Sequence, residues 1–112
     1  KAARLREKGA EILVLPNAHG KVELPALMQE LGSRGINELH VEARHKLNGP
    51  LLNEGCVDEL LLYLAPCFIG DRARGMAELP ELHDLAVRRK LKIDDVRTIG
   101  GDIRIIASWE TT

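Results

Sequence analysis

The chain is poor in aromatic residues and in cysteine, and it carries no excess of either charge. Of its 112 residues 3% are aromatic, two are cysteine, and the formal net charge is −1. So few aromatic side chains offer no platform on which bases could stack. The balanced charge offers no basic surface for a polyanion, so nucleic acid is not expected as a partner.

Long apolar runs are also missing. No run approaches the length of a membrane span, and the first residues show no signal-peptide pattern. Cys56 and Cys67 lack CxxC spacing and have no histidine pair nearby, so we interpret them as small buried apolar residues in a reducing compartment. We therefore expect a cytoplasmic protein without a metal site or a membrane partner.

What the sequence does contain is an alternation of helix and strand patterns. Residues 1–11 (KAARLREKGAE) are typical of the last turns of a helix, closed by Gly9. Apolar runs at 11–15 and 36–41 predict buried strands. Between them, Pro25 suits the first turn of a helix, which Gly32 or Gly35 ends. Because the chain opens on the tail of a helix, we expect it to be a portion of a larger domain.

The second half continues the pattern. Asn48 is a favourable N-cap for a short helix that tolerates Pro50 near its start and closes at Gly55. Residues 57–65 (VDELLLYLA) form the most apolar run and predict a central strand covered on both faces. Leu51 and Leu52 are expected to face inward.

The C-terminal part predicts a hairpin, because two strand-like runs, 91–99 and 103–109, flank Gly100-Gly101-Asp102. The whole order predicts an α/β fold, with a mostly parallel sheet, flanking helices and a C-terminal antiparallel hairpin.

The junction at residues 42–49 is the candidate site. Ligands of open α/β sheets lie beyond the carboxyl ends of the strands, where helix N-termini direct backbone N–H groups at them. Glu42 ends the predicted strand and could accept hydrogen bonds from a polar ligand. On this geometry alone the signal is weak, because every strand–helix turn has these properties and most such turns bind nothing.

Specific motifs resemble a known family. The segment V-E-A-R-H-K-L-N-G-P-L-L, followed by V-D-E-L-L-L-Y-L-A-P-C-F-I-G and later D-D-V-R-T-I-G-G-D-I-R-I, is similar to the reductase domain of the bacterial bifunctional riboflavin-biosynthesis deaminase/reductase. The resemblance covers nearly the whole chain. It implies a dihydrofolate-reductase-like fold, and it makes residues 1–112 the C-terminal portion of a single reductase domain.

The resemblance also implies a function. Members of the family use NADPH to reduce 5-amino-6-(5-phosphoribosylamino)uracil to its ribityl form. By this likeness Glu42 lies beside the substrate, while no residue of the chain is assigned a catalytic role. A homodimer and a preceding deaminase domain are also implied. The residues expected along the cofactor phosphates are Ala43, Arg44, His45, Lys46 and Leu47.

Two departures from the family pattern leave a second hypothesis open. Arg44 stands where the family usually has glycine, so its guanidinium either contacts a phosphate or obstructs the cofactor. The family's reductase domain is also about twice this long, so we expect little or no turnover from these residues alone. The alternative is a non-catalytic nucleotide-binding or dimerisation module.

Two further basic clusters are candidates for phosphate contacts. Arg72 and Arg74 would bind the phosphate of the substrate, and residues 88–90 (RRK) the 2′-phosphate of NADPH. Charge clusters of this kind are more often solvated faces.

Overall fold

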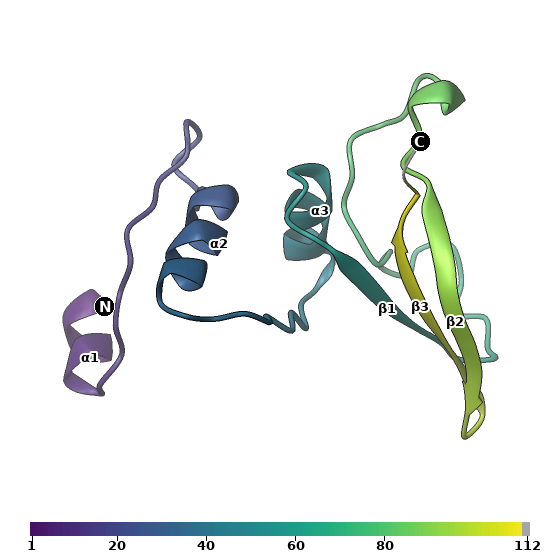
Figure 1. Ribbon diagram of the computed structural model, residues 1–112, viewed down its shortest axis with the longest axis horizontal. Coiled ribbons are helices and arrows are strands. Elements are labelled where there is room, and N and C mark those ends of the chain that lie inside the picture. The colour runs from purple at the N-terminus through teal and green to yellow at the C-terminus, as the bar shows by residue number, and fades with distance from the viewer. Residues whose placement is uncertain (111–112) are drawn as a thin grey trace. The chain divides into compact units, whose positions relative to one another are not determined.

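The computed structural model describes residues 1–110 and divides into two compact units, Lys1–His40 and the part from Val41 onward (Figure 1). The first unit holds helices α1 (Ala2–Glu7) and α2 (Leu24–Ser33). Between them Asn17 closes a turn, because its side-chain oxygen accepts hydrogen bonds from the backbone N–H groups of His19 (2.8 Å) and Lys21 (2.9 Å).

The three α-helices end in the same way. After α2, the N–H of Gly35 donates to the carbonyl of Gly32 (3.0 Å) and the N–H of Ile36 to that of Leu31 (3.2 Å). This pair of hydrogen bonds requires a residue at positive φ, and Gly35 has φ 85°. Gly9 and Gly55 close the other two helices with the same pattern. The predicted helix ends are confirmed, with Gly35 rather than Gly32 at the second.

The second unit contains α3 (His45–Asn53), a single 3₁₀ turn (Leu85–Val87) and three strands. The strands are β1 (Glu59–Leu64), β2 (Leu91–Ile99) and β3 (Asp102–Trp109). They form an antiparallel sheet in the order β1-β3-β2 (Figure 1). The predicted β2–β3 hairpin is confirmed, and Gly100 takes the positive φ of 60° that its turn requires.

The predicted parallel pairing is wrong for the part of the chain that the structure describes. Residues 11–15 and 36–41 are extended but join no sheet, and the only bridge near them links Pro16 to Val22. A strand needs a neighbouring strand for its N–H and C=O groups. Within residues 1–110 these segments make only isolated backbone bonds, such as that from the N–H of Glu23 to the carbonyl of Leu15 (2.6 Å), and no strand pairs with them. The run at 57–65 is also not central: β1 is an edge strand, and β3 lies in the middle.

One face of the sheet is apolar. Leu60 and Ile93 flank Ala107 in register, so the three side chains share a side. A β-bulge after Ile93 brings Val96, opposite Ile105, to that same side. Ala107 is only 2% exposed, whereas Ile93 and Val96 remain 60% and 54% exposed. The face is therefore only partly covered within residues 1–110.

The buried core is correspondingly small. Among the described residues, the hydrophobic side chains that are buried are Leu24, Leu51 and Ala107. The inward orientation predicted for Leu51 is confirmed, while Leu52 is half-buried. The expected burial of the cysteines is wrong for Cys67, which is exposed; Cys56 is half-buried. Cys67 lies after the end of β1, outside the sheet.

An ion-pair network joins the end of α2 to the preceding extended segment. The guanidinium of Arg34 lies 2.8 Å from the carboxylate of Glu11 and 2.9 Å from that of Glu30. The hydrogen bond and the charge of Arg34 hold the pKa of Glu11 below its ordinary value of 4.5. Because the folded pKa is the lower one, this pair stabilises the first unit above pH 4.5, and the contribution is lost as the pH falls through the folded pKa.

We expect Arg34→Gln to return the pKa of Glu11 toward 4.5. The substitution removes both the donor and the charge that favour the carboxylate. A carbon-13 NMR titration of the Glu11 carboxyl measures the change, and Lys21→Gln removes an exposed cation of the same unit as the control. An unchanged titration in Arg34→Gln would show that the ion pair does not form in solution.

Candidate functional site

Helix α3 begins four residues earlier than the sequence predicted, with its N-cap at position 44 rather than 48. Arg44 is its N-cap, with an extended backbone (φ −92°, ψ 171°). Its carbonyl accepts the first helical hydrogen bonds, from the N–H groups of Leu47 (3.1 Å) and Asn48 (3.0 Å). The prediction of Asn48 as N-cap is therefore wrong, and Pro50 lies inside the helix rather than at its start. Pro50 lacks the N–H that would have donated to the carbonyl of Lys46.

Asn48 instead connects two segments. Its side-chain amide donates to the carbonyl of Ala43 (3.2 Å), just before the helix, and to the carbonyl of Met76 (2.9 Å). The second bond crosses 28 residues of sequence. It attaches residues 74–78, which we call the 74–78 strap, to the first turns of α3.

Gly49 allows the strap to approach. A Cβ atom at this position would lie 1.8 Å from the carbonyl oxygen of Glu78, a distance that no side chain could occupy. With only hydrogen there, the backbones meet, and the N–H of Glu78 donates to the carbonyl of His45 (2.9 Å). Gly49 is buried accordingly. A glycine inside a helix costs stability, and close packing is its usual justification.

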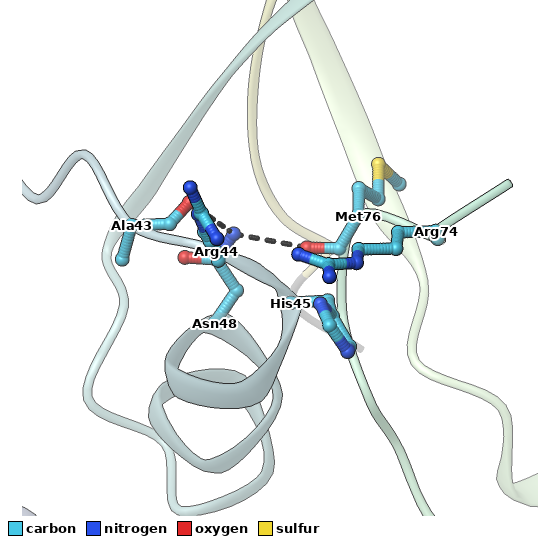
Figure 2. Close-up of a pocket in the computed structure, with 7 residues that line it drawn as sticks. Ala43, Arg44, His45, Asn48, Arg74 and Met76 are labelled. Atoms are coloured by element: carbon cyan, nitrogen blue, oxygen red, sulfur yellow. Dashed lines mark hydrogen bonds between the residues drawn. The ribbon is translucent and has the colours of Figure 1, made fainter.

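The strap and the start of α3 together line an open pocket of about 310 Å³ (Figure 2). In Figure 2 the Arg74 side chain extends from the strap toward the start of α3, where Arg44 and His45 lie. The lining residues are Ala43, Arg44, His45, Asn48, Arg74, Gly75 and Met76.

The pocket is suited to an anion. Two guanidinium groups and one imidazole line it, and none of its lining residues is acidic. The first backbone N–H groups of a helix have no intrahelical partner and carry the positive end of its dipole. A phosphate group, which accepts several hydrogen bonds and carries negative charge, matches these donors.

The structure brings part of the predicted set together. Ala43, Arg44 and His45 line the pocket, whereas Lys46 and Leu47 do not. Glu42 is exposed and does not line it either, although it directly precedes Ala43. Asn48, Gly75 and Met76 were not predicted as site residues. The glycine inside a helical pattern was the one sequence signal that another backbone lies close to α3.

The two predicted basic clusters differ in their position relative to the pocket. Arg74 lines the pocket, but Arg72 does not. Arg88 donates to the carbonyl of Leu85 (2.6 Å), and Arg89 donates to the backbone and side-chain oxygens of Asn53 (3.0 and 2.9 Å). Residues 88 and 89 therefore bind other parts of the chain.

Neither a metal centre nor a membrane span emerges from the described part of the chain. Within residues 1–110, no three His, Cys, Asp or Glu side chains are grouped closely enough to hold a metal ion. None of the helices there has the length and apolar character needed to cross a bilayer.

Comparison with known proteins identifies the family. A family model described as the RibD C-terminal domain matches residues 1–105. The chain belongs to the RibD C-terminal domain family. It is 42% identical over 91 residues to the riboflavin biosynthesis protein RibD of Escherichia coli (strain K12), covering 81% of the chain and 25% of that relative. The chain thus spans about a quarter of the length of this curated relative.

Two further matches bear on the fold and on the reductase portion. The solved structure of Acinetobacter baumannii RibD (form 2) superposes with a TM-score of 0.85 at 28% identity, over 96% of this chain and 29% of that one. This match confirms the predicted fold class. A 5-amino-6-(5-phosphoribosylamino)uracil reductase of Buchnera aphidicola is 34% identical over 79% of this chain and 42% of the relative.

We expect Gly49→Ala to detach the strap. The added methyl overlaps the carbonyl of Glu78, and overpacking of this kind costs about 1–3 kcal/mol. The measurements are urea unfolding followed by the fluorescence of Trp109, the one tryptophan, and hydrogen exchange at the Glu78 amide. Exchange at Glu78 should become faster, because its bond to His45 is lost.

Gly32→Ala is the matched control, since its new Cβ atom meets nothing within 4 Å and it also lies in a helix. It should leave the Trp109 transition and the Glu78 exchange unchanged. Unaltered Glu78 exchange in Gly49→Ala would contradict the close approach of the two backbones.

Proposed function

We propose that this chain forms the cofactor-phosphate side of a reductase in riboflavin biosynthesis. The reaction is the NADPH-dependent reduction of 5-amino-6-(5-phosphoribosylamino)uracil to its ribityl form. One observation carries the proposal: the turn predicted to follow the cofactor phosphates lines a pocket with two guanidinium groups, an imidazole and no carboxylate. The names of the relatives, which include an aminouracil reductase, support the same chemistry.

The residues present fit the phosphate groups of NADPH. Arg44 and Arg74 supply planar donors that bind phosphate oxygens in pairs, and His45 supplies a further donor. Lys46 and Leu47 lie in the first turn of α3, outside the lining of the pocket, and are proposed to contact the part of the cofactor that extends beyond it. NADPH supplies the hydride that reaches C1′ of the sugar. The task of the protein is then to hold donor and acceptor in line.

Glu42 is proposed as the substrate contact. Glu42 is exposed and directly precedes the pocket residue Ala43, which supports a contact with a substrate bound next to the cofactor. An ionised carboxylate accepts hydrogen bonds from ribose hydroxyls or from an amino group.

The arrangement of the whole protein is also a proposal. We infer a cytoplasmic homodimer in which a deaminase domain precedes the reductase domain. The coverage of 25% of the E. coli relative leaves ample length for such a domain in that protein. The half-exposed apolar residues on the sheet face, including Ile93 and Val96, are suited to burial against further protein.

A chimera tests the reductase function. The segment of E. coli RibD that matches this chain is replaced by this chain, and oxidation of NADPH is followed by absorbance with and without the substrate. Oxidation that depends on substrate is expected. Cofactor binding without oxidation, in a chimera that folds, would instead identify a non-catalytic nucleotide-binding module.

In this chimera we expect Glu42→Gln to lower kcat about 10-fold or more while changing the Kd for NADPH less than about 2-fold. The amide keeps the shape but loses the negative charge that binds the substrate, and loss of a charged hydrogen bond costs about 1.5–3 kcal/mol. Steady-state kinetics and a fluorescence titration of NADPH measure the two effects. Glu38→Gln, an exposed acid in the preceding segment, is the control. If the kinetic constant and the affinity for NADPH fell by the same factor, Glu42 would not be a specific substrate contact.

We expect Arg44→Gly to weaken NADPH binding about 10-fold, although glycine is the residue usual in the family. Arg44 lines the pocket together with Arg74 and His45, so its guanidinium is positioned to bind a phosphate. Arg44→Lys keeps the charge but not the paired donors, and should give an intermediate Kd. The Kd is measured by titration at two salt concentrations, because loss of an ionic contact also reduces the dependence on salt.

Arg88→Gln is the control for loss of one positive charge, since Arg88 donates to the carbonyl of Leu85 and lies outside the pocket. Its Kd for NADPH should be unchanged. Tighter binding by Arg44→Gly would show that the arginine obstructs the cofactor.

A further inference from the structure

We infer that Asn48 is a positioning residue: it holds Arg74 opposite Arg44 and His45, and thereby completes the phosphate-binding pocket. The inference rests on the proposed function and deepens it, because it assigns the affinity of the pocket to a contact between two distant segments. The family resemblance did not assign this role to Asn48.

The side-chain NH2 group of Asn48 is fully used by the attachment. Nδ2 has two hydrogens, and it donates to the carbonyls of Ala43 (3.2 Å) and Met76 (2.9 Å). The first bond fixes Asn48 to the residue that precedes Arg44. The second fixes it to the strap, two residues after Arg74. One planar group therefore sets the separation of the two arginine-bearing segments.

Packing contributes little to holding this part of the strap. Arg74, Gly75 and Met76 are all exposed, and the Met76 side chain retains 61% of its accessible surface. The backbone bond from Glu78 to His45 (2.9 Å) attaches the far end of the strap, beyond Met76. Without the amide of Asn48, the backbone from 74 to 77 would lose the side-chain contact closest to Arg74, and the guanidinium would sample many positions.

Pre-organisation gives this contact its effect on binding. A cation on a mobile loop must be ordered when the anion binds, and the lost freedom lowers the affinity. A cation already held opposite two other donors avoids that loss. Asn48 thus acts through Arg74, and its removal should matter only while Arg74 is present.

A double-mutant cycle with NADP⁺ as the probe tests this in the chimera with E. coli RibD described above. Titration calorimetry gives the Kd of the unsubstituted chimera and of its Asn48→Ala, Arg74→Gln and double variants. Each single change is expected to raise the Kd about 10-fold. The Kd of the double variant should exceed that of either single variant by no more than about 2-fold. Hydrogen exchange across 74–78 should quicken in Asn48→Ala but not in Arg74→Gln.

Asn53→Ala is the matched control. Asn53 is on the same helix and also bonds a distant arginine, Arg89, but it lies outside the pocket. The Kd and the exchange of the strap should not change. If Asn48→Ala loses the circular dichroism of the folded chain, Asn48→Ser replaces it in the cycle; one hydroxyl donor can satisfy only one of the two carbonyls, so a smaller loss that still vanishes without Arg74 is expected.

The outcomes separate this inference from the proposed function. If the unsubstituted chimera folds but does not bind NADP⁺, both are overturned. If it binds, but the effects of Asn48→Ala and Arg74→Gln multiply in the double variant, the cofactor site stands and the positioning role of Asn48 is wrong. An unchanged Kd in Asn48→Ala has the same meaning.

Discussion

The site depends on one attachment, that of the 74–78 strap to the first turns of α3. The amide of Asn48 reaches the carbonyl of Met76, and the N–H of Glu78 reaches the carbonyl of His45. Both bonds require a backbone separation that only glycine at position 49 permits. Because few apolar side chains are buried in the described residues, directional hydrogen bonds rather than packing determine where the strap lies.

This attachment turns an ordinary helix N-terminus into a pocket that is suited to an anion. A helix N-terminus alone offers weak, unspecific attraction for anions. The strap adds Arg74 to a surface that already contains Arg44 and His45, and none of the residues that line the pocket is acidic. Arg44 stands where the family usually has glycine, and this substitution is consistent with the arrangement. Glycine would let the backbone N–H groups approach a phosphate closely, whereas arginine supplies hydrogen-bond donors from its side chain.

The sequence predicted the local features well. Helix ends at Gly9, Gly35 and Gly55 and the hairpin turn at Gly100 follow from conformations that glycine adopts easily, so neighbouring residues suffice to identify them. The sequence-based prediction was wrong where a segment needs a neighbouring strand to form a sheet. Residues 11–15 and 36–41 have strand-like patterns but join no sheet within residues 1–110, because an apolar run does not show whether a neighbouring strand is present.

The family, the α/β class, the C-terminal hairpin and the glycine ends of the helices were determined by the sequence alone, since motifs and short-range backbone preferences are written in consecutive residues. The start of α3 at His45, the role of Asn48 and the membership of Arg74 in the pocket were decided only by tertiary structure. The physical reason is the range of the contacts. A hydrogen bond across 28 residues depends on the path of the whole intervening chain, which no local pattern specifies.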